Sequence, residues 1–247
     1  MNSEEYLKLA EVERVHWYYA GKRELVRRWL MRTAALSETD LLLDCGAGTG
    51  LFADSMRQFC KVRVLDDHAE SLAILRTRFA SGEIIEGPAT DIPLPAAAVD
   101  YVTALDVLEH IEDDRRAVEE IYRVLRPGGC VVVTVPALMM LWGYWDEALH
   151  HYRRYTAAEL RALFPAHSWE IIHVNYTNVV VVPAVWMIRS WQRWRKPGAA
   201  SRVEDKIPPR WLNRFLRMIF VHLGLVQGIR FPCGVSLLLV ARKRTSP

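Results

Sequence analysis

The sequence is short of cysteine and of long apolar runs. Its 247 residues include four cysteines, none of them in a C-x-x-C spacing, which argues against a disulfide framework and against a zinc site of paired cysteines. No stretch provides the ~20 consecutive apolar residues that a membrane-spanning helix needs. The acidic residues 1–5 are not followed by the apolar segment of a secretory leader. We therefore expect a cytoplasmic protein with reduced thiols.

A strong excess of one charge is also lacking. The formal net charge is +3, with 25% charged and 51% hydrophobic residues. Nothing in this balance predicts a nucleic-acid partner, and we find neither an internal repeat nor a low-complexity tract. The composition is that of a globular protein, and the length is sufficient for a single domain with a substantial core.

What the sequence does contain is an alternation of apolar strands and helices. Such alternation predicts an α/β fold with a parallel sheet and helices on both faces. A helix over residues 4–35 precedes the first strand. Strands are expected near residues 41–43, 62–66, 83–86, 99–105, 130–135, 169–174 and 235–240, and helices near 51, 72–79, 114–125 and 156–160.

Three alternating glycines follow the first predicted strand. Gly46, Gly48 and Gly50 give the spacing G-x-G-x-G, whereas a dinucleotide-binding turn has G-x-G-x-x-G. Asp44 stands two residues before Gly46, where a carboxylate would repel a pyrophosphate and attract an ammonium group. The pattern favours an adenosyl amino acid, bound along the backbone of Gly46, Ala47, Gly48 and Gly50. A dehydrogenase that binds NAD is the weaker alternative.

Two acids follow the second predicted strand, about twenty residues after the glycine turn. Asp66 ends this strand, where its carboxylate would accept hydrogen bonds from both ribose hydroxyls of a nucleoside. Asp67 would serve in its place. A helix N-cap is the other interpretation of Asp66, and it is compatible with the first.

Two further motifs, Ala104–Ile111 and Arg123–Gly129, complete a resemblance. With the glycine turn they make residues 40–136 similar to the class I S-adenosylmethionine (SAM)-dependent methyltransferases, and in particular to the ubiquinone-biosynthesis O-methyltransferases. The resemblance implies SAM as the cofactor. It also implies a Rossmann-like, doubly wound, seven-stranded sheet whose last strand runs antiparallel at the edge. A single domain would comprise an N-terminal helical lid (1–36), a SAM-binding core (37–175), a helical insertion (176–230) and a last strand with a basic tail (231–247).

The same resemblance implies further cofactor contacts. Asp91 would meet the adenine amino group, and Leu105 would line the cofactor pocket. Arg23 would reach the methionine carboxylate, although a plain solvent-facing arginine is an equal interpretation of this residue.

A cluster after the fourth predicted strand matches a metal site of the quinone-pathway relatives. Asp106, Glu109 and His110 stand where those relatives bind a divalent cation, with aspartate at the first position in place of the more usual glutamate. Carboxylates and imidazole are able to hold such an ion. Both Glu109 and His110 are candidate catalytic residues. Without a metal, Glu109 could instead only brace a helix, and His110 would be a general base or a substrate contact.

A second cluster of aromatic, histidine and arginine residues follows the fifth predicted strand. Loops at this end of an α/β sheet close over ligands, so an acceptor pocket is one interpretation and a loop packed by its own aromatics is the other. The candidate acceptor contacts are Trp142, Tyr144, His150, Arg154 and Tyr155, with His151 as a second candidate base.

The predicted insertion interleaves tryptophan with arginine over residues 178–217. Such a pattern suits helices that lie in a bilayer interface, and a helical cap on the core is the alternative. We therefore expect methyl transfer from SAM to an oxygen of a small, lipophilic or lipid-linked acceptor, with peripheral membrane contact through this segment. The alternatives are a sugar or an N- or C-methyltransferase of a small molecule, and a SAM-binding partner protein without turnover.

Overall fold

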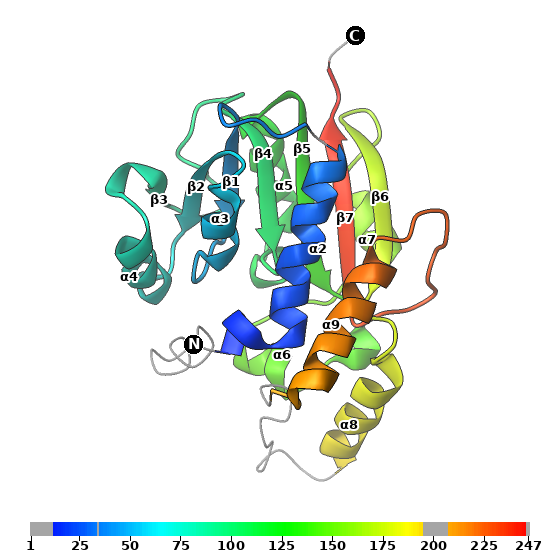
Figure 1. Cartoon of the computed structure of the whole chain (residues 1–247). Coiled ribbons are helices and arrows are strands. Elements are labelled where there is room, and N and C mark those ends of the chain that lie inside the picture. The colour runs from blue at the N-terminus through cyan, green and yellow to red at the C-terminus, as the bar shows by residue number, and fades with distance from the viewer. Residues whose placement is uncertain (1–11, 34, 195–206, 246–247) are drawn as a thin grey trace.

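Seven strands form one sheet in the order β3-β2-β1-β4-β5-β7-β6. The computed structural model describes residues 12–33, 35–194 and 207–245, and within them the expected fold class is confirmed (Figure 1). The strands β1 to β5 pair in parallel, so their carboxyl ends lie at one end of the sheet. The strands are β1 (Leu41–Cys45), β2 (Lys61–Asp66), β3 (Ile84–Glu86), β4 (Val99–Leu105), β5 (Leu125–Pro136), β6 (Trp169–Thr177) and β7 (Ser236–Lys243).

The last strand, β7, lies inside the sheet. It pairs antiparallel with β5 on one side and with β6 on the other, so its antiparallel direction is confirmed and its expected place at the edge is wrong. Burial gives the physical reason. The first six residues of β7 are buried in succession, whereas β6 mixes buried, intermediate and exposed positions. A strand that is buried on both faces suits the interior of a sheet, and β6 takes the edge.

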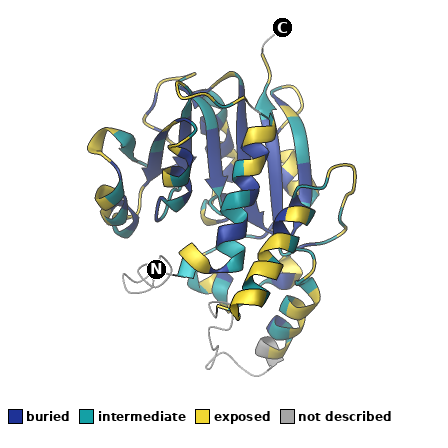
Figure 2. Cartoon of the chain, viewed as in Figure 1, coloured by how far each residue is buried: buried dark blue, intermediate teal, exposed yellow. Residues whose placement is uncertain are grey.

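Helices cover both faces of the sheet. One buried cluster includes side chains of α2 (Trp17–Thr33), α3 (Leu51–Met56), α4 (Ala69–Arg78) and α9 (Arg210–Gly224). The opposite cluster includes side chains of α5 (Asp114–Val124) and α7 (Ala157–Ala162). Figure 2 shows the strands between these layers as the most deeply buried part of the chain. The remaining helices are α6 (Tyr144–Ala148), α8 (Val182–Trp194) and the 3-10 helices η1 (Ser81–Glu83), η2 (Leu108–His110) and η3 (Met139–Leu141).

The N-terminal helix α2 and the insertion helix α9 pack on each other. Trp29 of α2 is fully buried, and its indole Nε1 donates a hydrogen bond to the carbonyl of Gly224 at 2.9 Å. A Cβ on Gly224 would lie 2.6 Å from a methyl group of Leu25, so this close approach requires glycine. The helix predicted over residues 4–35 is observed at 12–15 and 17–33, and residues 1–11 lie outside the described residues.

Among the described residues, none of the helices has both the length and the apolar character needed to cross a bilayer.

Candidate functional site

The glycine turn after β1 lies at the carboxyl end of the sheet and has a backbone that other residues avoid. Gly46, Gly48 and Gly50 have φ angles of +68°, +56° and +71°, in the left-handed region that favours glycine. A Cβ on Gly46 would lie 2.5 Å from Val107, and one on Gly50 would lie 2.4 Å from Phe79. A Cβ on Gly48 would meet no atom within 4 Å. Gly48 therefore faces open space, where a ligand can approach the backbone closely.

Asp44 is buried at the end of β1, directly before this turn. Its Oδ1 accepts a hydrogen bond from Thr103 Oγ1 at 2.6 Å, and the residue is 3% exposed. Burial raises the pKa of Asp44 to about 7; the hydrogen bond from Thr103 opposes this rise, and the nearby Glu13 and Asp66 carboxylates add to it. A cation beside this carboxylate would favour its charged form, so the position suits an ammonium group.

Asp66 links the glycine turn to α4. Its Oδ2 accepts hydrogen bonds from Gly48 N and Ser71 Oγ, both at 2.9 Å, and its Oδ1 accepts one from His68 N at 3.0 Å. The N-cap of α4 is His68, so Asp66 braces this helix without being the cap. Asp67 is exposed and lies 2.8 Å from His68 Nδ1. The assignment of either acid to the ribose stays a prediction.

An N-terminal carboxylate that the sequence reading missed lies against the same turn. Glu13 Oε2 accepts a hydrogen bond from Thr49 Oγ1 at 2.6 Å, and Glu13 Oε1 pairs with Arg23 Nη1 at 3.5 Å. Arg23, the predicted partner of the methionine carboxylate, thus holds a carboxylate of the chain itself beside the glycine turn. Glu13 and Thr49 are 36 positions apart, so no local motif signals their contact.

Asp106 follows β4 in a left-handed backbone with φ of +56°. Its Oδ1 accepts a hydrogen bond from Thr134 Oγ1 at 2.8 Å, and its Oδ2 forms an ion pair with Lys22 of α2. Although burial opposes both shifts, this ion pair keeps the pKa of Lys22 above its usual range and that of Asp106 below it. The carboxylate of Asp106 is therefore engaged by α2 and β5, and Lys22 is a second site residue that the sequence reading missed.

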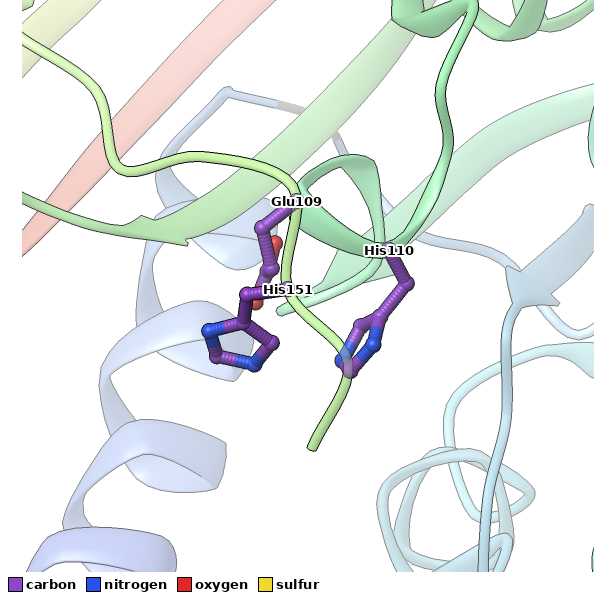
Figure 3. Close-up of side chains that lie close together, drawn as sticks. All are labelled: Glu109, His110 and His151. Carbon is purple, nitrogen blue, oxygen red and sulfur yellow. The ribbon is translucent and has the colours of Figure 1, made fainter. Parts of the chain in front are cut away.

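Glu109 and His110 of η2 meet His151 from the loop after α6 (Figure 3). Each side chain offers a ligand atom, and these atoms lie within 4.8 Å of one another. The rings of His110 and His151 are edge to face, with centroids 4.5 Å apart. One group that could hold a metal ion is therefore Glu109, His110 and His151. Asp106, which the sequence placed in this set, lies outside the group because Lys22 and Thr134 hold its oxygens, and metal binding itself stays a prediction.

The protonation states in this cluster are shifted toward neutral groups. Glu109 is fully buried, and neither of its carboxylate oxygens has a hydrogen-bond partner. Burial, and then the charge of Asp106, raises the pKa of Glu109 well above its usual range. Partial burial of the imidazole, and then the charge of the neighbouring His151, lower the pKa of His110 to about 4. The residue as a whole is exposed. Both shifts therefore favour the uncharged form of the group, the carboxyl at Glu109 and the neutral imidazole at His110.

Asp146 of α6 orients His151 from inside the protein. Asp146 is fully buried, and its Oδ1 accepts hydrogen bonds from His151 Nδ1 at 3.0 Å and from Arg154 Nε at 2.7 Å. Its Oδ2 lies 3.3 Å from Arg189 Nη1 of α8. Because Nδ1 of His151 donates a hydrogen bond to this carboxylate, Nε2 is the nitrogen able to accept a proton or to bind a metal. Asp146 and Arg189 are 43 positions apart, so no local motif in the sequence predicts that they meet.

Comparison with known proteins identifies the family. Residues 43–133 match the family model described as a methyltransferase domain. An uncharacterized methyltransferase of Mycolicibacterium gilvum is 31% identical over 205 residues, which cover 81% of the chain and 78% of that protein. The chain belongs to the class I SAM-dependent methyltransferases. SAM is therefore the cofactor of this methyltransferase, whereas the finer resemblance to the ubiquinone-biosynthesis enzymes stays a prediction.

Other relatives match shorter parts of the methyltransferase. A probable SAM-dependent methyltransferase of Mycolicibacterium smegmatis is 32% identical over 157 residues, which are 62% of the chain and 60% of that protein. A demethylmenaquinone methyltransferase of Chlorobaculum tepidum is 34% identical over 39% of the chain and 41% of its own length. The chain thus spans about three fifths or less of these two relatives. The complex between the Haloferax volcanii Trm112 methyltransferase activator and a putative methyltransferase contains a chain of the same fold, with a TM-score of 0.63, 18% identity and coverage of 99% and 95%.

Several predicted ligand contacts remain on or near the surface of the methyltransferase. Tyr144 and His150 are exposed, and Trp142 is half-buried, in the segment that follows β5. Leu105 is half-buried at the end of β4, and Asp91 is exposed in the segment after β3. Their assignment to acceptor, cofactor pocket and adenine stays a prediction.

Two of the predicted acceptor contacts belong to the protein interior. The hydroxyl of Tyr155 donates a hydrogen bond to Asp114 Oδ2 at 2.8 Å, and Tyr155 is 3% exposed. Arg154 is 6% exposed and donates hydrogen bonds to Asp146 and to the carbonyl of Ala137. Both residues are therefore corrected to structural roles, because their polar atoms bind groups inside the protein.

If Asp44 binds the ammonium group of SAM as predicted, its raised pKa makes SAM affinity depend on pH. A carboxyl group with a pKa of about 7 is mostly protonated at about pH 5.5 and half ionised at about pH 7. Since the ionised form is the one that attracts an ammonium group, we expect the association constant for SAM to rise about tenfold over this interval. Isothermal calorimetry at several pH values measures it. The Asp44→Asn variant should bind SAM weakly with little pH dependence, and an equally steep dependence in that variant would contradict the assignment.

Proposed function

We propose that the methyltransferase transfers the methyl group of SAM to an oxygen of a small, lipophilic or lipid-linked acceptor, with His151 as general base. The Asp146–His151 pair is the observation that carries this proposal. Asp146 fixes the imidazole through Nδ1 at 3.0 Å, which leaves Nε2 to take the proton of the acceptor hydroxyl. The buried carboxylate then stabilises the imidazolium that forms.

The chain's own residues hold the cofactor in this proposal. When bound, SAM supplies a methyl group on a sulfonium, which is already an activated leaving group. The left-handed glycine turn and the buried Asp44 fit such a ligand, because the turn leaves Gly48 open and the carboxylate matches an ammonium group. Arg23 binds the methionine carboxylate once it is released from Glu13. The proposed cofactor contacts are Asp44, the backbone of Gly46, Ala47, Gly48 and Gly50, Asp66 or Asp67 at the ribose, Asp91 at the adenine, Leu105 and Arg23.

Orientation of the acceptor is the main remaining task of the protein. Holding two reactants in line contributes roughly 7–11 kcal/mol to catalysis. Glu109 offers two buried oxygens that have no hydrogen-bond partner. His110, whose pKa is lowered to about 4, contacts the acceptor beside His151. Trp142, Tyr144 and His150 supply the outer contacts.

The lipophilic character of the acceptor is supported by two observations. The relative from Chlorobaculum tepidum is named for demethylmenaquinone, a lipophilic quinone. The segment 178–217 of this chain presents exposed tryptophans near the carboxyl end of the sheet, which supports peripheral membrane contact. A sugar, or a nitrogen or carbon atom of a small molecule, is the alternative acceptor.

A divalent cation is the second candidate for activating the acceptor. The unpartnered oxygens of buried Glu109, together with His110 and His151, form a carboxylate and two-imidazole donor set, which suits such an ion. Asp146 would orient His151 as a carboxylate commonly orients a metal-bound histidine. When bound, the ion would lower the pKa of the acceptor hydroxyl.

The experiment that tests the proposed function is transfer from methyl-labelled SAM into fractionated host extracts. We expect the label in the lipid fraction, in a product whose ether or ester bond is identified by mass spectrometry. Label confined to water-soluble sugars, or a labelled amine, would select the alternative acceptors.

A further inference from the structure

The exposed large hydrophobic side chains of this protein are concentrated at one end. Among the described residues all of them except Val15 and Met31 lie between residues 139 and 229. Figure 1 shows α6, α8 and the start of α9 at the end of the molecule to which β4 and β5 point. We define the docking face by six of these exposed residues: Met140 of η3, Trp186 and Met187 of α8, and Trp211, Phe215 and Met218 of α9.

The spacing of these residues gives each helix an exposed apolar stripe. On α9, Trp211, Phe215 and Met218 are 72%, 49% and 59% exposed, and they stand at helical positions i, i+4 and i+7. Residues with this spacing lie on one face of a helix. Another side of α9 packs on α2, where Phe220 contacts Trp17 and Tyr18 and Gly224 lies against Leu25. The stripe is therefore the outer face of a helix whose inner face is already packed.

The same segment is strongly basic. Residues 178–230 contain eight arginines and two lysines against one glutamate and one aspartate, although the whole chain has a net charge of only +3. Arg210 and Arg214 are exposed on α9, next to Trp211 and Phe215. Tryptophans interleaved with arginines suit the headgroup region of a bilayer, where the rings enter the interface and the guanidinium groups meet anionic lipids.

Contacts of α8 link the docking face to the loop that carries His151. Arg189 of α8 donates a hydrogen bond to the carbonyl of Leu141 in η3, and it lies 3.3 Å from Asp146 Oδ2. Asp146 in turn holds His151. Arg189 of α8 thus contacts both η3, which carries Met140 of the docking face, and the residue that holds the proposed base.

We propose that the docking face binds the surface of an anionic bilayer, with the carboxyl ends of the strands turned toward the lipid. The proposal rests on the proposed function only for the idea that the acceptor arrives from the membrane. The proposal adds that the lipid is anionic and names the residues that bind it. The alternative is that a protein partner or a second copy of this chain covers the docking face.

Vesicle co-sedimentation of the full chain tests the proposal without SAM or acceptor. We expect binding to vesicles of equal parts phosphatidylcholine and phosphatidylglycerol at low salt, and weak binding to phosphatidylcholine alone. The Arg210→Ala/Arg214→Ala variant should lose about thirtyfold in partition coefficient on the anionic vesicles. The Trp211→Ser/Phe215→Ser variant should lose about tenfold or more.

The matched control is Met31→Ser, an exposed apolar residue of α2 outside the docking face, which should bind like the wild type. Thermal unfolding checks that each variant is folded. The proposal is overturned if the wild type stays in the supernatant with anionic vesicles, or if the tryptophan variant binds as well as the wild type. It is also overturned if ultracentrifugation shows a dimer that the Trp211→Ser/Phe215→Ser change dissociates. Because binding is measured without turnover, a wrong acceptor assignment leaves this result unchanged.

Discussion

Replacing His151 by alanine is expected to lower kcat about 10²- to 10⁴-fold, the usual contribution of a positioned general base. The SAM dissociation constant should change by less than about twofold, because His151 lies in the cluster after α6 and the proposed cofactor contacts lie on the glycine turn. Turnover with methyl-labelled SAM measures the first quantity and calorimetry the second. The structural basis is the buried Asp146 carboxylate, which holds His151 Nδ1 at 3.0 Å.

The neighbouring His150 is the matched control for this change. His150 is exposed and is not part of the cluster of Glu109, His110 and His151. As a proposed outer contact it would affect acceptor affinity, so His150→Ala should raise KM and retain kcat within about tenfold of the wild type. Equal losses in His150→Ala and His151→Ala would contradict the assignment of the base. Asp146→Asn is a poorer probe, since it removes the buried negative charge that pairs with Arg154 and Arg189, and breaking a buried ion pair destabilises a protein by about 3–5 kcal/mol.

A chelator distinguishes two roles of His151 that would both explain a loss of activity in His151→Ala, namely general base and metal ligand. If His151 acts as a base, exhaustive dialysis against a chelator leaves the wild-type rate unchanged. If the cluster holds a divalent ion, the rate falls on chelation and returns when the ion is added. Glu109→Gln should then lower metal affinity about 10- to 100-fold or more, a loss at least as large as that from an altered orienting residue.

The geometry of the proposed cofactor site could be predicted from the sequence because it is local, whereas its contacts with SAM stay a prediction. Asp44 and the glycines follow one strand, Asp66 ends the next, and each position is fixed by a turn of a few residues. Parallel strands then bring both turns to the same end of the sheet. The alternating glycines predicted a turn that favours residues without a Cβ, and their left-handed φ angles agree with it.

The rest of the site depends on contacts between distant parts of the chain. Lys22 meets Asp106 across 84 positions, and Arg189 meets Asp146 across 43. Sequence periodicity predicts that α2 has a buried face, but it does not say which carboxylate that face will meet. The interior place of β7 escaped prediction for the same reason: its burial pattern is local, whereas its choice of neighbours depends on the whole sheet.

Replacing Gly50 by alanine is expected to destabilise the fold by about 2–5 kcal/mol. A left-handed backbone costs an alanine about 1–2 kcal/mol, and overpacking of a core adds about 1–3 kcal/mol. Both terms apply, because φ at Gly50 is +71° and its Cβ would lie 2.4 Å from Phe79 and 2.7 Å from Leu75. Those two side chains are 5% and 0% exposed, so they have little room to move. Urea denaturation measures the loss in the free energy of unfolding.

Gly48 provides the matched control, because its backbone is left-handed like that of Gly50 but no atoms are packed against it. With φ of +56° and no atom within 4 Å of the added Cβ, Gly48→Ala should lose only about 1–2 kcal/mol of stability. The methyl group of Gly48→Ala would project to the side on which SAM is proposed to lie, so SAM affinity should fall by about tenfold or more. The main effect of Gly50→Ala, in contrast, should be on stability. If both variants lost the same stability, packing behind the turn would not be what fixes Gly50; if Gly48→Ala bound SAM normally, the cofactor would not lie against this part of the turn.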